Sequence, residues 1–370
     1  MRVQIFGHPY APIGMGEQLA SFSKALDAVH IEHGIYDIYQ SNAKLKQNRP
    51  WLIAKESKDI NAGDINIFHI NGDEIENCLA HLKTKGFDFS KGKNIIIPAW
   101  ELENYPKVWQ DGINKFDEVW TISHFVKKIF SASWVKPTVR YVGQSAEREK
   151  GVCYPKKYFG IKDSSLVFLG FFDQSSYFTR KNPYALLEFY KKMRKKYPYS
   201  DFQLVLKVKN INQESDLKLD KIDENVVLIN QNLSYDETTS LLDSCDIFVS
   251  LHRSEGFGRG AAEAILRNKR AIITNYSGVE DYSKDKAVIP VSYNLVNVQE
   301  GEYPYYENQV WAEPDIDEAV EKASSIINEW ENGITNAHFF EKNLDAGDIV
   351  KSVATHFSVG INILNNLSGE

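Results

Sequence analysis

Residues 252–263 of the chain read His252-Arg253-Ser254-Glu255-Gly256-Phe257-Gly258-Arg259-Gly260-Ala261-Ala262-Glu263. They follow an apolar run, residues 246–251, of the kind that fills the middle of a parallel sheet, and continue into an alanine-rich segment that predicts a helix. Three glycines let the backbone approach a ligand, and the N–H groups that open a helix carry positive partial charge. The stretch therefore predicts a strand, a loop and a helix start that can hold phosphate oxygens.

Two carboxylates belong to the same stretch. Glu255 falls in the glycine loop, and Glu263 falls about one turn into the helix that follows. A carboxylate beside a phosphate repels the ligand unless it faces hydroxyl groups, whose protons it accepts. We therefore expect one carboxylate to hold a hexose and the other a ribose, on either side of a diphosphate. The alternative is that both are ordinary solvated charges.

The segment from Ser254 to Asp281 resembles the donor site of the retaining GT-B glycosyltransferases of family four. The resemblance rests on the Glu-x7-Glu pair, the Gly-Phe-Gly between its members, residues 271–275 and Gly278. It implies that Glu255 lies against the donor sugar and that Glu263 grips the nucleotide ribose. The donor-binding residues expected from the loop are Gly256, Phe257, Gly258 and Arg259. The resemblance implies no cofactor, and the donor substrate is a nucleoside diphosphate sugar.

Basic residues precede a predicted helix that begins at Pro183. Arg180 and Lys181 are adjacent there and can neutralise a diphosphate. In the resembling family a Lys just ahead of this helix contacts the donor phosphates, and Lys181 matches it. A common Arg after the preceding strand is missing, with Asp173 and Gln174 near its place. We expect Glu255, Lys181 and Arg180 to be catalytic and Lys207 to bind the donor, and which cation acts on the phosphates stays open.

The first half of the chain offers a second glycine loop. Gly14 and Gly16 follow the first predicted strand and resemble the N-terminal glycine loop of the same family, which faces the donor. A dehydrogenase would need a third glycine at position 19, where this chain has Leu19. We therefore expect both glycines to bind the donor.

A Trp-Glu-Leu-Glu segment ends another predicted strand. Residues 100–103 resemble a segment found in a subset of these transferases from surface-polysaccharide pathways. Carboxyl ends of parallel strands border the ligand cleft, so we expect Trp100, Glu101 and Glu103 to contact the acceptor or a sugar. Core packing is the alternative for the aromatic residues of this region.

The chain alternates strand-like and helix-like segments in two sets, which indicates α/β architecture with parallel sheets. The resemblance implies the GT-B fold, two Rossmann-like doubly wound domains facing a central cleft. We expect an N-terminal acceptor-side domain over 1–150, a nucleotide-sugar-binding domain over 151–346, and a terminal helix over 347–370 that crosses back to the first domain. The polar stretch 143–161 is the expected linker.

Composition narrows the class of protein. A chain of 370 residues with 43% hydrophobic and 25% charged residues is long enough for two soluble domains, and a net charge of −7 disfavours nucleic-acid binding. Cys78, Cys153 and Cys245 are scattered, which fits a reducing compartment. No run reaches the roughly 18 apolar residues of a spanning helix, so we expect a cytoplasmic protein. Lysine pairs at 44/46, 83/85, 91/93 and 127/128 leave peripheral contact with the inner membrane face open.

Metal dependence finds little support in the sequence. The Asp-x-Asp of Asp315 and Asp317 precedes a helical pattern, where Asp is an ordinary N-cap. His69, His124 and His252 show no ligand spacing. We expect activity without a divalent ion.

The sequence thus predicts retaining transfer of a sugar from a nucleoside diphosphate sugar to a saccharide or lipid-linked saccharide, in the synthesis of cell-surface polysaccharide or glycoconjugate. One alternative is a sugar-nucleotide epimerase of the same fold. The other is a catalytically silent subunit of a polysaccharide assembly complex. A few loop side chains decide the nucleotide base, the sugar and the acceptor, so the sequence leaves these undetermined.

Overall fold

The computed structural model describes residues 2–11, 13–40, 46, 49–61, 63–149, 151–173, 177–209 and 223–369. Lys44, Gln174 and the domain boundary expected at residue 150 lie outside these ranges. The chain divides into two compact units. The first contains residues 1–147 and 352–370, and the second contains residues 148–351.

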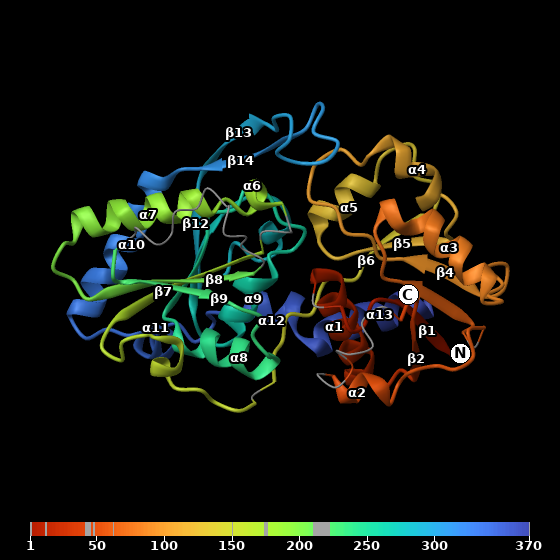
Figure 1. Cartoon of the computed structure of the whole chain (residues 1–370), viewed down its shortest axis with the longest axis horizontal. Helices are drawn as coiled ribbons and strands as arrows, with labels where there is room; N and C mark the ends of the chain where they lie inside the picture. Colours follow the sequence, from red (N-terminus) through yellow and green to blue (C-terminus); the bar gives the residue numbers. More distant parts are fainter. Residues whose placement is uncertain are drawn as a thin grey trace. The chain divides into compact units, whose positions relative to one another are not determined.

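The first unit is built on a six-stranded parallel sheet with the order β2-β1-β3-β4-β5-β6 (Figure 1). Its strands are β1 (Val3–Gly7), β2 (His33–Asp37), β3 (Ile65–Phe68), β4 (Lys93–Ile96), β5 (Glu118–Thr121) and β6 (Thr138–Tyr141). Its helices are α1 (Gly14–Ala28), α2 (Pro50–Ile53), the 3₁₀ helix η2 (Gly72–Glu74), α3 (Ile75–Thr84), α4 (Lys107–Ile113) and α5 (His124–Phe130). Because right-handed crossovers step from β1 to β2 on one side and from β3 to β6 on the other, α1 covers one face and α3 to α5 the opposite face.

The C-terminal residues complete the first unit. α13 (His356–Ser368) packs along α1. A Cβ at Gly360 would overlap the carbonyl oxygen of Ala25 and lie 2.8 Å from Val29 Cγ1, so glycine permits this close approach. The prediction of a single terminal helix over residues 347–370 is wrong. The segment forms α12 (Asp348–Ala354) and α13, because the Thr355 hydroxyl accepts a hydrogen bond from the Ser358 N–H at 3.1 Å and starts a new helix.

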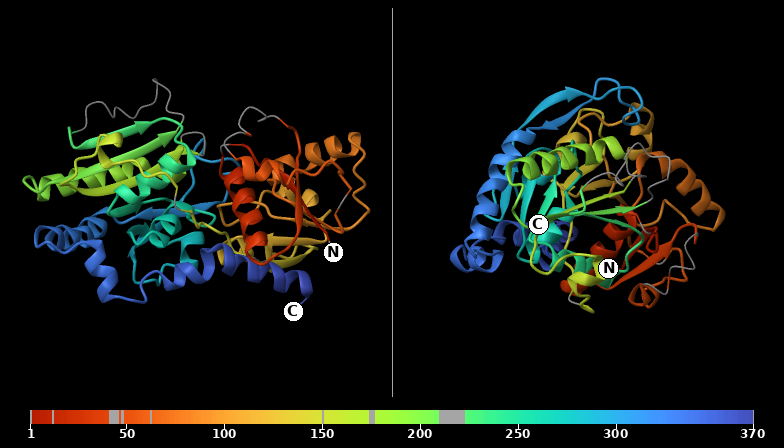
Figure 2. Two further views of the ribbon diagram at one scale, coloured as in Figure 1. Left: turned by 90° about the horizontal axis from the view of Figure 1, so that it is seen from below. Right: turned by 60° about the vertical axis from the view of Figure 1, so that its left-hand side comes forward.

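The second unit has its own parallel sheet (Figure 2). It has six strands in the order β12-β11-β10-β7-β8-β9. Its strands are β7 (Leu166–Asp173), β8 (Phe202–Lys209), β9 (Val226–Asn230), β10 (Ile247–Ser250), β11 (Arg270–Thr274) and β12 (Val288–Val291). Its helical segments are η3 (Lys156–Phe159), α6 (Phe178–Lys181), α7 (Pro183–Lys196), α8 (Tyr235–Ser244), α9 (Arg259–Leu266), η5 (Ser277–Asp281), α10 (Ile316–Glu331) and α11 (Asn336–Lys342). The predicted α/β class with two parallel sheets is confirmed.

An antiparallel hairpin that the sequence did not predict follows β12. β13 (Tyr293–Asn297) pairs with β14 (Val310–Pro314) and forms a separate two-stranded sheet (Figure 1). The Trp311 side chain on β14 is buried, and the backbone N–H of Ala312 donates to the carbonyl of Arg253 at 2.9 Å. The hairpin is therefore anchored beside the loop that follows β10.

Local side chains fix the starts of several helices, including the one predicted to begin at Pro183. At the start of α5 the Ser123 hydroxyl accepts a hydrogen bond from the Val126 N–H at 3.2 Å. At the start of α8 Ser234 and Glu237 form a capping box. Pro183 occupies the first turn of α7, where its missing N–H would have no helical partner.

Candidate functional site

The candidate residues of the second unit meet where β7 lies beside β10. Along the chain β7 leads to β8 on one side of this point, whereas β10 leads to β11 on the other. Open α/β sheets bind ligands outside the carboxyl ends of the strands at such a reversal. The loop after β7 carries α6, and the loop after β10 carries Glu255. The topology therefore brings two loops that are distant in sequence to one place.

The glycine loop ends at Gly258, which is the N-cap of α9 and has a φ of 79°. A Cβ at this position would overlap Val279 Cγ1 and lie 2.6 Å from the Tyr282 hydroxyl oxygen. Both the left-handed backbone and the lack of space require glycine here. Glycine offers no capping side chain, and a helix that begins this way can take an anion at its first turn.

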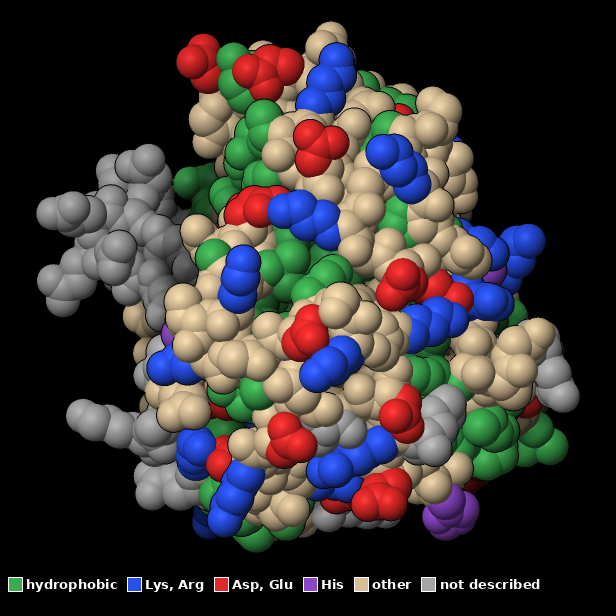
Figure 3. Space-filling model, turned by 90° about the vertical axis from the view of Figure 1, so that its right-hand side faces the viewer, with side chains coloured by type: hydrophobic (Ala, Val, Ile, Leu, Met, Phe, Trp, Pro, Cys, Tyr) green, Lys and Arg blue, Asp and Glu red, His purple; other side chains and the backbone are tan. Residues whose placement is uncertain are grey.

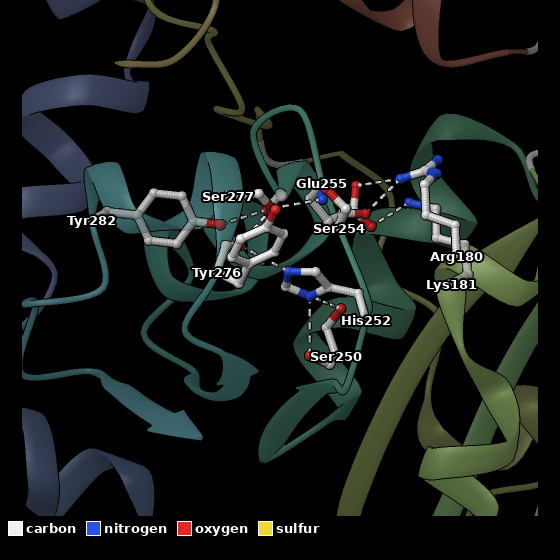
Figure 4. Close-up of polar contacts among 10 residues, drawn as sticks. Arg180, Lys181, Ser250, His252, Ser254, Glu255, Tyr276, Ser277 and Tyr282 are labelled. Carbon is white, nitrogen blue, oxygen red and sulfur yellow. Dashed lines mark hydrogen bonds and ion pairs between the residues drawn. The ribbon is translucent and has the colours of Figure 1, made fainter. Parts of the chain in front are cut away.

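Hydrogen bonds to η5 fix the shape of the loop (Figure 4). The Glu255 N–H donates to Ser277 Oγ at 2.8 Å, and the Gly278 N–H donates to the Glu255 carbonyl at 2.9 Å. The Tyr282 hydroxyl donates to the Gly258 carbonyl at 2.7 Å. The loop is thus held in one conformation before any ligand arrives, which lowers the entropic cost of binding.

The predicted catalytic residues form one ion-paired cluster (Figure 4). Glu255 Oε1 lies 2.5 Å from Lys181 Nζ, and Glu255 Oε2 lies 3.5 Å from Arg180 Nη1. The side chain of Glu255 is 13% exposed, that of Arg180 3% and that of Lys181 23%. Of the two cations, Lys181 is therefore the more accessible.

The charge state of Glu255 follows from these neighbours. Burial alone would raise its pKa, but the positive charges of Lys181 and Arg180 outweigh burial and lower the pKa to about 2. The carboxylate is ionised at neutral pH and acts only as a hydrogen-bond acceptor. Sugar hydroxyl groups are suitable donors for it.

Backbone contacts of α6 position the two cations. The Arg253 N–H donates to the Arg180 carbonyl at 2.9 Å, and Arg180 Nη1 donates to the Ser254 carbonyl at 2.8 Å. Tyr177 and Asn182 on either side of α6 have positive φ values of 55° and 52°, so the chain turns sharply before and after this short helix. Arg180 thus connects the two loops, and its neighbour Lys181 reaches the carboxylate.

Glu263 belongs to a second cluster. Its side chain is 4% exposed; Oε1 accepts from Arg259 Nε at 2.5 Å, and Oε2 lies 2.9 Å from Arg148 Nε. Burial would raise the pKa of Glu263, but Arg148 and Arg259 lower it. The predicted ribose-binding carboxylate is therefore ionised and held by two arginines, which fixes its orientation.

Lys207 lies within the electrostatic field of the Glu263 cluster. Burial is the main cause of its lowered pKa, and the charges of Lys209 and Arg148 lower the pKa further. Glu263 acts in the opposite direction. The six charged residues predicted for this unit thus fall into two groups: Glu255 with Arg180 and Lys181, and Glu263 with Arg259 and Lys207.

Three contributors to the site were not predicted. Arg148 lies in the expected linker, where its charge carried no distinguishing pattern. Ser277 and Tyr282 hold the loop through hydrogen bonds that depend on tertiary structure.

The predicted residue Phe257 is buried, with its ring centroid 5.6 Å from that of Tyr282, so its side chain packs against Tyr282.

The two glycines of the first unit have different surroundings. A Cβ at Gly16 would overlap the carbonyl oxygen of Ala11 and lie 2.9 Å from that of His8, so this glycine closes the turn onto α1. A Cβ at Gly14 would meet no described atom within 4 Å. Of the two, only Gly14 borders open space.

Trp100 is 3% exposed, and its Nε1 donates to the Asn104 carbonyl at 3.0 Å. Its ring packs edge-on against Tyr105 and Trp109. This burial favours the packing alternative for Trp100 over direct stacking on a sugar. Glu101 and Glu103 are partly exposed.

Asp315 has the capping role predicted for it, since its carboxylate accepts a hydrogen bond from the Glu318 N–H at 2.9 Å at the start of α10. In the described part of the chain no three His, Cys, Asp or Glu side chains are grouped so that they could hold a metal ion.

Charges of both signs are mixed on the face drawn in Figure 3. Two members of the predicted lysine pairs form ion pairs: Lys46 with Glu56 at 2.5 Å and Lys93 with Glu118 at 2.7 Å.

Among the helices that the structure describes, none has the length and apolar character needed to cross a membrane.

One family model matches part of the chain. A family model described as glycosyl transferases group 1 matches residues 174–332, a range that contains Lys181, Glu255 and Glu263. No curated protein sequence matches the chain significantly.

Solved structures match over the whole chain. Anabaena HepE in complex with UDP and glucose has a TM-score of 0.62 at 14% identity, with 100% of both chains covered. Sucrose-phosphate synthase from Thermosynechococcus elongatus has a TM-score of 0.65 at 11% identity, covering 100% of this chain and 98% of the other. Trehalose-6-phosphate synthase, OtsA, has a TM-score of 0.63 at 10% identity, covering 100% and 99%.

These neighbours are GT-B glycosyltransferases, and the chain has their fold. The family match lies within the second unit and supports a glycosyltransferase.

Proposed function

We propose that this chain is a retaining glycosyltransferase that moves a sugar from a nucleoside diphosphate sugar to a saccharide or lipid-linked saccharide acceptor. The observation that carries the proposal is the cluster of Glu255, Lys181 and Arg180 beside the glycine loop. The Glu255 carboxylate can accept hydrogen bonds from hydroxyl groups, and the accessible cation of Lys181 lies in contact with it. A sugar and the phosphate joined to it need these two partners side by side.

In the proposed reaction the bond between the anomeric carbon and the diphosphate oxygen breaks, and both electrons remain on that oxygen. Lys181 and the first turn of α9 stabilise the negative charge that develops on the diphosphate. The acceptor hydroxyl oxygen bonds to the anomeric carbon from the face that the diphosphate leaves, and its proton passes to a diphosphate oxygen. Glu255 orients the sugar through its hydroxyl groups.

We assign different roles to the two cations. Lys181 contacts the donor phosphates because it is the more exposed of the two. Arg180 is a positioning residue, since its guanidinium is buried between Glu255 and the Ser254 carbonyl. From the family resemblance we further propose that Glu263 holds the ribose, in the orientation that Arg148 and Arg259 impose.

Properties of the structural neighbours support the finer parts of the proposal. One neighbour holds UDP and glucose, and another, from E. coli, is bound with UDP-2-fluoro glucose. Trehalose-6-phosphate synthase, a neighbour at 9% identity, is a subject of work on glycosyl transfer with retention. The resemblance of the Trp-Glu-Leu-Glu segment supports a place in surface-polysaccharide or glycoconjugate synthesis. We propose that the protein acts in the cytoplasm.

The decisive experiment combines donor binding with turnover. Purified protein is screened by thermal shift against UDP-, GDP- and dTDP-sugars, because a ligand of the folded state raises the melting temperature. Glu255→Gln and Lys181→Ala are then compared with wild type in transfer to an acceptor saccharide, with Lys192→Ala as control. Lys192 also pairs with carboxylates, Glu188 and Asp317, but on the surface of α7.

We expect each site variant to lose about two orders of magnitude or more in turnover, since each removes a group that acts on developing charge or on sugar position. Lys192→Ala should retain full activity. Near-normal turnover by both folded site variants would reject the proposal. Turnover should also persist in EDTA, because Lys181 takes the place of a divalent ion at the phosphates.

The same samples distinguish the alternatives. An epimerase would convert the donor to another nucleotide sugar without any acceptor. A silent subunit would show no turnover with any donor.

A further inference from the structure

The loop of the β13–β14 hairpin contains a cavity that the proposed donor site does not use. Residues 298–309 connect the two strands, and the cavity beside them has a volume of about 270 Å³. Its polar lining comes from Asn297, Gln299, Tyr306, Glu307 and Asn308. This volume lies near the lower limit of small-molecule sites, roughly 300 Å³, so the cavity fits a single sugar ring.

The lining favours a neutral ligand rich in hydroxyl groups. Amide side chains both donate and accept hydrogen bonds, a carboxylate accepts from hydroxyls, and a tyrosine ring offers an apolar face with a polar tip. Residues 293–313 include four glutamates and no Lys or Arg. These glutamates would repel a phosphate or another anion.

Backbone hydrogen bonds hold the loop in this shape. The Val298 N–H donates to the Gln309 carbonyl at 3.0 Å, and the Gln309 N–H donates to the Tyr306 carbonyl at 3.1 Å. Tyr305 and Asn308 have positive φ values of 53° and 58°. Positive φ values are uncommon for residues with a Cβ, so these two positions define sharp turns of the loop. The turns and the backbone hydrogen bonds together shape the cavity.

The hairpin is connected directly to the Glu255 cluster. Arg253, two residues before Glu255, lies 2.6 Å from Glu313 of β14, and its guanidinium lies 5.3 Å from the centre of the Trp311 ring. Tyr303 of the loop packs against Tyr177, which precedes α6, with ring centroids 4.5 Å apart. The cavity thus belongs to an element attached to both loops that supply the cations and the carboxylate.

We propose that the hairpin cavity is a second saccharide site, which binds one neutral sugar residue of the acceptor. The identification of the ligand as acceptor rests on the proposed transferase function, whereas the binding of a neutral sugar does not. Glu307 and the amides bind its hydroxyl groups, and Tyr306 packs against its ring. Attachment to Arg253 and Tyr303 would keep such an acceptor close to the donor.

Saturation-transfer NMR tests the site with glucose, galactose, mannose and N-acetylglucosamine at millimolar concentration, with UDP present to occupy the donor site. We expect at least one sugar to give a signal with wild type. Tyr306→Ala and Glu307→Gln should each weaken binding about tenfold, the effect of losing roughly one good contact. Tyr199→Ala is the matched control, because Tyr199 is 99% exposed and distant in sequence from the hairpin.

Absence of signal with all four sugars, or equal signals from wild type and Tyr306→Ala, would overturn the proposal. Affinity that falls steeply with salt would also overturn it, because a neutral sugar releases no counterions and that result would indicate a cationic ligand of the glutamates. UDP binding, followed by thermal shift in the same samples, reports on the donor site independently. Sugar binding by a protein that binds none of UDP, GDP and dTDP would reject the proposed transferase and keep the hairpin site. Nucleotide binding without sugar binding would reject the hairpin site and keep the proposed transferase.

Discussion

Gly258 is the residue on which the loop geometry depends most directly. Changing it to Ala adds a Cβ that overlaps Val279 Cγ1 and lies 2.6 Å from the Tyr282 hydroxyl, in a backbone with a φ of 79°. Left-handed backbone costs a residue with a Cβ about 1–2 kcal/mol, and overpacking adds about 1–3 kcal/mol. We expect Gly258→Ala to lower the free energy of unfolding by about 3 kcal/mol and to abolish donor binding.

Gly333→Ala is the control for that substitution. Gly333 has a φ of 76°, but a Cβ there would meet no described atom within 4 Å. It should cost only the backbone contribution, about 1 kcal/mol, and leave donor binding intact. Urea unfolding measures the free energy of unfolding of both variants, and thermal shift measures their donor binding. Equal losses of unfolding free energy would show that the contacts with Val279 and Tyr282 are unimportant.

The ionisation of Glu255 predicts a pH dependence of stability. Its pKa is about 2 in the folded protein, below the ordinary value of about 4.3 for a glutamate in the unfolded chain. The carboxylate therefore stabilises the fold above the unfolded pKa, and this contribution disappears as the pH falls from about 4.5 toward 2. Comparing the unfolding free energies of wild type and Glu255→Gln across this range isolates the effect of this one group.

We expect the stability advantage of wild type over Glu255→Gln to shrink by about 3 kcal/mol as the pH is lowered through that window. A difference that stays constant from pH 5 to the onset of acid unfolding would mean that Lys181 and Arg180 do not stabilise the ionised form in solution.

Sequence reasoning identified residues at this scale where strand ends fix their place. Glu255, Lys181 and Arg180 follow two neighbouring strands of one sheet, so their meeting follows from the topology. Arg148 could not be predicted as a partner of Glu263, because the contact depends on how an irregular segment lies against α9. The burial of Trp100 likewise depends on the packing of Tyr105 and Trp109.

At the scale of elements, helix starts were predictable because a capping side chain acts on amides only two or three residues away. Asp315 shows this at α10, where its carboxylate accepts a hydrogen bond from the Glu318 N–H. The hairpin formed by β13 and β14 was not predictable in the same way. Its strands are joined by residues 298–309. This connection is longer than the two-residue turns by which a hairpin is recognised in a sequence.

Ser234→Ala tests how much a cap contributes. It removes the hydroxyl that accepts from the Glu237 N–H at 3.2 Å and leaves the first turn of α8 without that partner. We expect a loss of about 1 kcal/mol in the free energy of unfolding. Ser325→Ala, within α10, should change stability by less than about 0.5 kcal/mol, because the Ser325 side chain is exposed. Urea denaturation of both variants gives the comparison, and equal effects would contradict a specific role for the cap.

At the scale of the whole molecule, the two alternating sets of strands and helices were enough to predict two doubly wound sheets. Each crossover is local in sequence, and its handedness is nearly invariant. The alternation of strands and helices does not predict that the C-terminal residues 352–370 return to the first unit. That return depends on Gly360, where packing against α1 and helix propensity favour opposite residues.

The sign of the change in unfolding free energy caused by Gly360→Ala therefore distinguishes between these two effects. Helix propensity alone would make Ala more stable by about 1 kcal/mol. The overlap of the new Cβ with the Ala25 carbonyl oxygen, and its 2.8 Å distance from Val29 Cγ1, should instead destabilise the first unit by about 2 kcal/mol. Gly112→Ala in α4 is the control. The three heavy atoms nearest to its Cβ all belong to the Ile75 side chain, at 3.2 Å or more, so it should destabilise the first unit less than Gly360→Ala. Calorimetry with and without UDP measures both units, since UDP should raise the melting of the second unit while Gly360→Ala lowers that of the first. A gain in stability from Gly360→Ala would show that α13 does not pack on α1 in solution.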